Sequence, residues 1–203
     1  MLIDIVILPP ESIRAKVGKK ISFVAKNYPH NYVVDNIKLI PHLSLFHLRI
    51  LKSKLDKLEQ MVETVVGKYK SFQLKSVGFV KYDKDLVLQF RISKPATLSK
   101  LNRDIIQRCH KFRTGELLSW YKDYPFPRLD KLYIKKYGSY WSTGKNFDPH
   151  FTMVKYKFVD DGSRMTKKMG NFGFKFLADT VAVCEINKHG QVIKILKKFK
   201  LKA

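Results

Sequence analysis

The chain has 203 residues, of which 45% are hydrophobic and 13% aromatic, and this composition excludes an intrinsically disordered protein. Its 40 Lys and Arg residues outnumber 17 Asp and Glu residues, which gives a formal net charge of +23. A fold does not require this excess, so the charge indicates a polyanionic partner, with nucleic acid as the first candidate and an anionic membrane surface as the second. The length suits a single domain over residues 1–203, and we expect a monomer.

Cysteine usage and the apolar runs bear on location. Cys109 and Cys184 lack the CxxC spacing of a zinc cluster and are too few for a disulfide framework. Residues 2–8 include Asp4, lack a basic leader and run straight into two prolines, unlike a signal peptide. No uncharged apolar run approaches the length of a transmembrane helix. We therefore expect a soluble, cytoplasmic protein.

Apolar periodicity divides the chain into interspersed strands and helices. In the first part of the chain, we predict a strand at 2–8, a helix that begins near residue 11, a loop at 28–36, a strand within 37–50 and a helix at 51–66. A hairpin of strands at 71–82 and 86–93 follows, then a helix at 97–112, one or two short helices within 115–137 and a loop at 138–149. The last part contains a strand at 150–158, a short basic helix at 164–169 and a hairpin of strands at 173–187 and 191–201. Because tight turns join several of the strands, we predict an α+β fold with mainly antiparallel sheets.

Two five-residue stretches, one in each half of the chain, share a pattern. Residues 41–45 are Pro-His-Leu-Ser-Leu and residues 149–153 are Pro-His-Phe-Thr-Met. Period-two alternation predicts strands, and residues i and i+2 of a strand point the same way. His42 therefore shares a face with Ser44, and His150 with Thr152. One His-x-Ser alone is more often structural, but two copies behind the same proline predict a shared site.

These paired motifs resemble those of the two-histidine phosphoesterase superfamily, which includes the bacterial RNA 2′,3′-cyclic phosphodiesterases, also called 2′,5′ RNA ligases. The chain length and the separation of the motifs are also similar to that family. The resemblance implies two pseudo-symmetric lobes whose motif strands flank a central groove, and a reaction that uses no metal or other cofactor. It also implies that His150 is the general base and His42 the general acid, although the near symmetry of the pair leaves the opposite assignment open.

The chemistry of the four residues suits hydrolysis of a phosphate ester. A neutral imidazole can take a proton from water, a protonated one can give a proton to the leaving oxygen, and Ser44 and Thr152 can donate hydrogen bonds to the phosphate. We predict a metal-independent phosphodiesterase whose substrate is an RNA or nucleotide with a 2′,3′-cyclic phosphate, or a 2′,5′ linkage. One alternative is a basic RNA-binding protein that holds phosphate in this groove without turnover. Another is a membrane-surface or protein-interaction module.

A metal site has little support in the sequence. Asp148 is near His150, but a proline intervenes and no equivalent acid accompanies His42. We therefore predict no metal and no cofactor.

The residues around the motifs have other predicted roles. Tyr140 and Trp141 could stack a base at the rim of the groove, or could belong to the core. By strand parity, His47, Arg49 and Lys155 face away from the motif side chains, and we expect them to lie outside the site.

Overall fold

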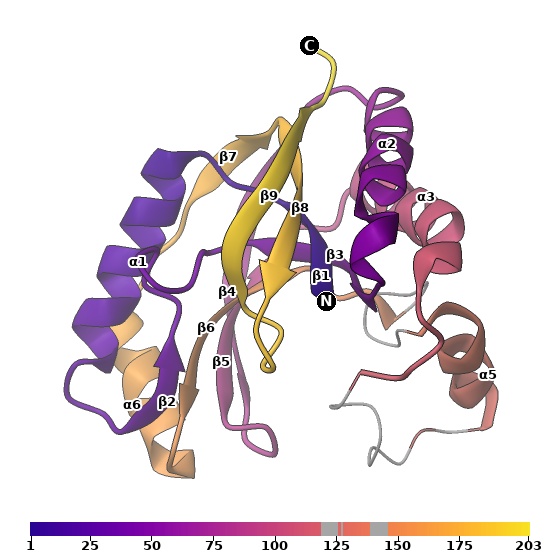
Figure 1. Ribbon diagram of the computed structural model, residues 1–203. Helices are drawn as coiled ribbons and strands as arrows, with labels where there is room; N and C mark the ends of the chain where they lie inside the picture. The colour runs from indigo at the N-terminus through magenta and orange to yellow at the C-terminus, as the bar shows by residue number, and fades with distance from the viewer. Residues whose placement is uncertain (119–125, 127, 139–145) are drawn as a thin grey trace.

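The computed structural model describes residues 1–118, 126, 128–138 and 146–203. Its strands form two sheets, and four of its helices cover them (Figure 1). The strands are β1 (Leu2–Ile7), β2 (His30–Val33), β3 (Leu43–Arg49), β4 (Phe72–Tyr82), β5 (Val87–Ile92), β6 (His150–Tyr156), β7 (Lys175–Ala178), β8 (Thr180–Ile186) and β9 (Val192–Lys200). The helices are α1 (Glu11–Ala25), α2 (Leu55–Val66), α3 (Ala96–Cys109), α5 (Arg128–Tyr137) and α6 (Val159–Met169), with short 3₁₀ turns at 52–54 and 110–112.

The four strands of the first sheet correspond in order to four of the five strands of the second sheet. The first has the order β3-β1-β8-β9, and the second has the order β2-β6-β5-β4-β7. All pairings within them are antiparallel. Each motif strand, β3 or β6, thus begins a row of four strands, and β2 is an addition beside β6. Helices α2 and α3 pack on the first sheet, while α1 and α6 pack on the second. The predicted α+β fold with two pseudo-symmetric lobes is confirmed.

Most predicted elements are present, with three differences. The loop predicted at 28–36 contains β2, a four-residue strand with two exposed residues and thus little apolar pattern. The strand predicted at 173–187 divides at Asp179 into β7 and β8, which belong to different sheets. The helix predicted at 164–169 begins five residues earlier, at Val159. Its first turn carries Asp160 and Asp161, which suits the positive end of the helix dipole.

The motif strands meet in the middle of the molecule. Strands β3 and β6 are in contact although they belong to different sheets. Behind them, one cluster of buried apolar residues includes members of both sheets, among them Leu43, Phe46, Phe151 and Met153. The apolar residues of both motifs thus anchor their strands in the core, and the polar residues face the other way. Among the described helices, none is long and apolar enough to cross a bilayer.

Candidate active site

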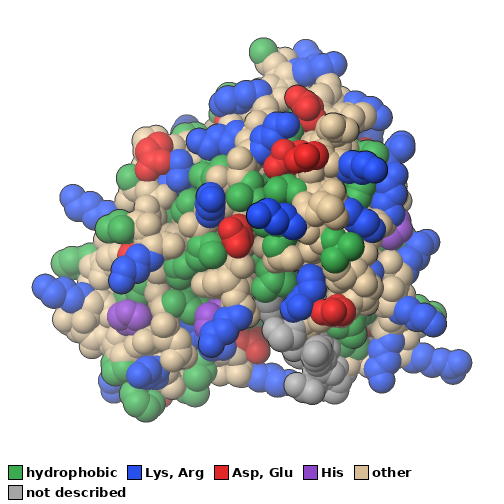
Figure 2. Space-filling model, viewed as in Figure 1, with side chains coloured by type: hydrophobic (Ala, Val, Ile, Leu, Met, Phe, Trp, Pro, Cys, Tyr) green, Lys and Arg blue, Asp and Glu red, His purple; other side chains and the backbone are tan. Residues whose placement is uncertain are grey.

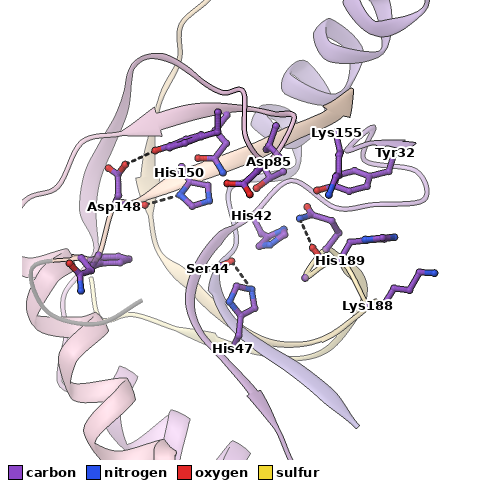
Figure 3. Close-up of a pocket in the computed structure, with 18 residues that line it drawn as sticks. Tyr32, His42, Ser44, His47, Asp85, Asp148, His150, Lys155, Lys188 and His189 are labelled. Atoms are coloured by element: carbon purple, nitrogen blue, oxygen red, sulfur yellow. Dashed lines mark hydrogen bonds between the residues drawn. The ribbon is translucent and has the colours of Figure 1, made fainter. Parts of the chain in front are cut away.

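The structure brings the four motif residues into one pocket. His42, Ser44, His150 and Thr152 all line a cavity of about 420 Å³ between the two sheets. His42 lies just before β3, where the chain enters the first sheet, and it is 5% exposed. His150 is the first residue of β6. Figure 3 shows the two rings near each other, one from the segment that enters β3 and the other from β6.

Each motif histidine is held by the carbonyl two residues before it. His42 Nδ1 is 2.7 Å from the Ile40 oxygen, and His150 Nδ1 is 2.7 Å from the Asp148 oxygen. Carbonyl oxygens only accept hydrogen bonds, so each Nδ1 carries a hydrogen and donates it. When neutral, both rings therefore keep the lone pair on Nε2, and this identical arrangement makes Nε2 the atom of each ring that can take up a proton.

Both carbonyls are fixed in turn. The Ile40 N–H donates to the Val192 carbonyl at 3.0 Å, which ties this segment to β9. The Asp148 carboxylate accepts hydrogen bonds from Tyr82 at 3.3 Å and from Arg91 at 3.2 Å. Such outer contacts restrict the orientation of the histidine rings.

Two β-bulges bring in further residues. In β3, Leu45 has no partner residue in β1, because Val6 pairs with Ser44 and the preceding Ile5 pairs with Phe46. In β6, Met153 has no partner residue in β5, because Gln89 pairs with Thr152 and the preceding Leu88 pairs with Val154. Each extra residue comes three positions after a motif histidine, and it reverses the alternation of side chains beyond it.

The prediction that His47 and Lys155 face away from the site is therefore wrong. Both line the pocket, each five residues after a motif histidine. Parity fails because it assumes an unbroken strand, whereas each strand has a bulge between the hydroxyl residue and this position. Arg49 is outside the pocket, where it forms an ion pair with Glu116 at 3.0 Å.

A buried carboxylate lies behind the first motif. Asp4, in the middle of β1, is 0% exposed. Its Oδ2 accepts a hydrogen bond from Ser44 Oγ at 2.6 Å and lies 3.1 Å from His47 Nε2. The same oxygen is 3.6 Å from His42 Nε2. The hydrogen of the Ser44 hydroxyl is therefore given to Asp4. In contrast, the Thr152 hydroxyl has no hydrogen-bond partner within the described part of the chain.

The three pocket histidines differ in their tendency to hold a proton. Burial lowers the pKa of His42 and of His150 below the ordinary value, and neighbouring groups only partly offset it. Burial alone would also lower the pKa of His47, but the Asp4 carboxylate and hydrogen bonds to Asp4 and to the Gly190 backbone raise it. His47 therefore holds a proton more readily than either motif ring.

Comparison with solved structures shows which fold this is. TT0787 of Thermus thermophilus superimposes with a TM-score of 0.64 and 15% identity, over 100% of this chain and 98% of that chain. A crystal structure described as a phosphoesterase gives a TM-score of 0.63 and 14% identity, over 99% and 98%. LigT of E. coli bound to 3′-AMP gives 0.61 and 13%, over 99% and 98%. The chain has the LigT fold.

The LigT fold is what the paired motifs predicted through their resemblance to the two-histidine phosphoesterases, and the resemblance is confirmed at the level of the fold. In sequence comparisons, no family model and no curated protein matches this chain. TM-scores of 0.61 to 0.64 establish a shared architecture, and at 13% to 15% identity this likeness carries no information about the reaction of this chain.

The rim of the pocket has its own aromatic and charged groups. Tyr32 and His189 face each other with ring centroids 5.6 Å apart, next to Lys155 and Lys188 (Figure 3). Tyr32 comes from β2, the strand added beside β6, and His189 comes from the β8–β9 turn. Burial raises the pKa of Tyr32 to about 12, so its hydroxyl stays protonated. Asp85, from the β4–β5 turn, is also part of the lining.

Two further predictions concern the pocket. Tyr140 and Trp141, proposed to stack a base, lie outside the described residues. Within residues 1–118, 126, 128–138 and 146–203, no group of three or more His, Cys, Asp or Glu side chains is arranged to hold a metal ion. The absence of a metal requirement stays a prediction.

Proposed function

We propose that this protein is a metal-independent phosphodiesterase that opens RNA-like 2′,3′-cyclic phosphates or hydrolyses 2′,5′-phosphodiester linkages. The observation that carries the proposal is the matched pair of Nδ1 contacts. Both motif rings donate to a backbone carbonyl at 2.7 Å, and both thereby reserve Nε2 for proton exchange beside one pocket. Binding of phosphate alone needs only cations, so two preset imidazoles favour acid–base chemistry.

The two rings take opposite parts in the reaction. We assign His150 as the base: its neutral Nε2 takes a proton from the water that attacks phosphorus. We assign His42 as the acid: its Nε2 gives a proton to the ribose oxygen when the bond between phosphorus and that oxygen breaks. Asp4 Oδ2, 3.6 Å from His42 Nε2, supports this assignment, because a carboxylate stabilises the protonated form of a neighbouring imidazole. The product from a cyclic phosphate is a ribose phosphomonoester.

The charge of the phosphate is balanced from both lobes. Lys155 provides a cation from β6, and His47, whose pKa is raised by Asp4, adds a positive charge from β3 when it is protonated. We assign Thr152 as the first hydroxyl donor, because Ser44 gives its hydrogen to Asp4. Ser44 can donate to phosphate only after its hydroxyl rotates away from that carboxylate. These contacts act on non-bridging oxygens, where charge develops in the transition state.

The nucleoside part of the substrate fits the rim. Tyr32 and His189 offer aromatic faces beside Lys155, and such faces bind a base by stacking. The solved LigT structures include complexes with 3′-AMP and with ATP. A nucleotide bound in the same fold supports a nucleotide, or the end of an RNA, as the ligand here.

A second candidate function is binding of RNA without turnover. The formal net charge of +23 favours it, and Figure 2 shows Lys and Arg side chains spread over the visible face of the molecule. A surface of this kind attracts a polyanion whether or not the pocket is catalytic.

One experiment separates the two functions. The protein is incubated with the four nucleoside 2′,3′-cyclic phosphates and with 2′,5′- and 3′,5′-linked dinucleotides, with and without a chelator, and products are identified by chromatography. We expect opening of the cyclic phosphate or cleavage of the 2′,5′ linkage, insensitive to chelator and lost in His42→Ala and His150→Ala. Tight RNA binding with no product from any of these compounds would leave the binding function instead.

A further inference from the structure

A single carboxylate oxygen organises the first lobe of the pocket. Asp4 Oδ2 receives the Ser44 hydroxyl at 2.6 Å, lies 3.1 Å from His47 Nε2, and is 3.6 Å from His42 Nε2. Within the described residues, Asp4 Oδ1 has no hydrogen-bond partner. A fully buried carboxylate is costly unless donors and cations compensate it, and all three contacts converge on Oδ2.

The second lobe has no buried carboxylate at the equivalent position; its Asp148 lies before β6, is partly exposed and pairs with Arg91 at 3.2 Å. Strand pairing places Asp4 opposite His47 in the first sheet, and Val87 opposite Lys155 in the second. His47 and Lys155 hold equivalent positions, five residues after a motif histidine and beyond a bulge, so Val87 holds the place of Asp4. The pocket is symmetric in its histidines and hydroxyls and asymmetric in this carboxylate.

We propose that Asp4 and His47 are positioning residues that make His42 the proton donor of the pair. Asp4 steadies the protonated His42 ring and fixes the Ser44 hydroxyl, and His47 holds Asp4 in place. The inference rests on the two-histidine reaction proposed above and adds to it a physical reason for the division of roles.

The effect of Asp4 on His42 is electrostatic and directional. His42 Nδ1 is committed to the Ile40 carbonyl, so an added proton goes to Nε2, the atom that lies 3.6 Å from Asp4. The Asp4 charge raises the pKa of His42, although burial lowers it by more. The effect of Asp4 is larger than the opposite effect of His47. At the equivalent place in the second lobe stands Val87, which has no charge. Asp148 also raises the pKa of His150, but its carboxylate is partly exposed and pairs with Arg91 at 3.2 Å, whereas Asp4 is fully buried. The proton of the pair is therefore better held on His42.

Other charged or titratable groups surround the two rings on every side. Besides Asp4, they are His47 on β3, Lys155 on β6, Tyr32 on β2, Tyr82 on β4, Asp148 before β6, Asp85 before β5, and Lys188 and His189 before β9. Of these, His47 is the one whose charge lowers the pKa of both His42 and His150. Asp4 and His47 thus act on His42 in opposite directions, and this gives the proposal a test with two signs.

The first arm of the test is Asp4→Asn, which keeps the size of the side chain and removes its charge. We expect kcat for a nucleoside 2′,3′-cyclic phosphate at neutral pH to fall about tenfold or more, with KM changed by less than about threefold. We also expect the pH optimum of kcat/KM to move lower. The optimum lies midway between the pKa values of acid and base, and loss of Asp4 lowers the pKa of His42.

The second arm is His47→Gln, which keeps a hydrogen-bond donor near Asp4 and removes the cation. We expect the pH optimum to move higher, because the His47 charge no longer lowers the pKa of either motif histidine. A purely structural role for these residues predicts lower stability and no opposite displacement of the two profiles.

A double variant guards against loss of folding. Asp4→Val/His47→Lys reproduces the pair that the second lobe already carries at Val87 and Lys155, and it leaves no buried carboxylate unpaired. We expect it to fold and to show a lower pH optimum than the wild type. An unchanged optimum in this variant and in Asp4→Asn would overturn the inference. A wild-type protein without turnover, or full activity in His42→Ala, would instead contradict the proposed function on which the inference rests.

Discussion

Leu45 and Met153 occupy the same place in two different strands: each is the extra residue of a β-bulge, three positions after a motif histidine. Both are completely buried, so each bulge is held by the core. Beyond the bulge, the side chain five positions after the histidine turns into the pocket. The two lobes therefore share a local irregularity as well as a sequence motif, and the irregularity supplies His47 and Lys155.

Removal of either motif histidine should abolish most activity. We expect His42→Ala and His150→Ala each to lower kcat/KM about 100-fold or more, because each ring performs a separate proton transfer. The double variant should be little worse than either single one, since both rings act on one transition state. Steady-state kinetics on a nucleoside 2′,3′-cyclic phosphate measures this, with circular dichroism as a check on folding. Losses that multiply in the double variant would contradict the mechanism.

The two motif hydroxyls should differ in their effect on stability. Ser44 donates to the fully buried Asp4, and we expect Ser44→Ala to lower the free energy of unfolding by about 1–3 kcal/mol. The Thr152 hydroxyl has no partner among the described residues, so Thr152→Val should change stability little and should lower kcat/KM about tenfold. Urea unfolding of the two variants compares them directly. Equal losses of stability would show that the Asp4 contact is not specific to Ser44.

The pH optimum of kcat/KM should lie below 6.5. The pKa values of His42 and His150 both lie below that value, mainly because burial disfavours the charged ring. The active form carries one proton on the pair, so its population peaks midway between the two pKa values and falls on both sides. We expect kcat/KM to peak below pH 6.5. The kcat optimum should lie higher, because an anion next to an imidazole favours its protonated form. A kcat/KM profile that peaks in the alkaline range would exclude this pair as acid and base.

Lys155 should affect substrate binding more than turnover. We expect Lys155→Met to raise KM about tenfold and to weaken the salt dependence of substrate binding, because one phosphate contact is lost. Lys57→Met on α2 is the matched control, since this lysine is exposed and does not line the pocket. Kinetics at several salt concentrations measures both. Equal effects of the two substitutions would mean that only the overall charge of the protein matters.

Tyr32 should matter only when the ligand has a base. We expect Tyr32→Ala to weaken binding of 3′-AMP by about tenfold, because stacking is lost, and to leave binding of inorganic phosphate unchanged. Isothermal titration calorimetry with the two ligands makes the comparison. Weaker binding of both ligands would indicate that Tyr32 supports the phosphate site through the structure of β2 instead.

The paired motifs and most of the elements could be predicted because they depend on local pattern. Alternation predicted both motif strands, and the tight turns predicted the hairpins β4–β5 and β8–β9. The bulges could not be predicted in this way, because an extra residue is defined by the register of the partner strand. Strand parity therefore misplaced His47 and Lys155, the two residues that follow the bulges.

The sequence indicates that Asp4 is unusual, but it does not indicate what Asp4 contacts. A carboxylate among the branched apolar residues of a predicted strand implies a buried charge that needs partners. Its partners, Ser44 and His47, come from a strand some forty residues later, and nothing near Asp4 identifies them. The residue was thus visible as an anomaly, while its function required the pairing of β1 with β3.

The order of the strands means that the two lobes are not the two halves of the sequence. The first sheet takes β1 and β3 from the beginning of the chain and β8 and β9 from its end, whereas the second sheet is made from the segments between them. Strand β1, which carries Asp4, is thus covered on one edge only when it pairs with β8, a strand from near the other end of the chain. Contacts of such long range require the closure of a large loop, which costs entropy and slows folding. The pocket is therefore completed only after the two ends of the chain have met.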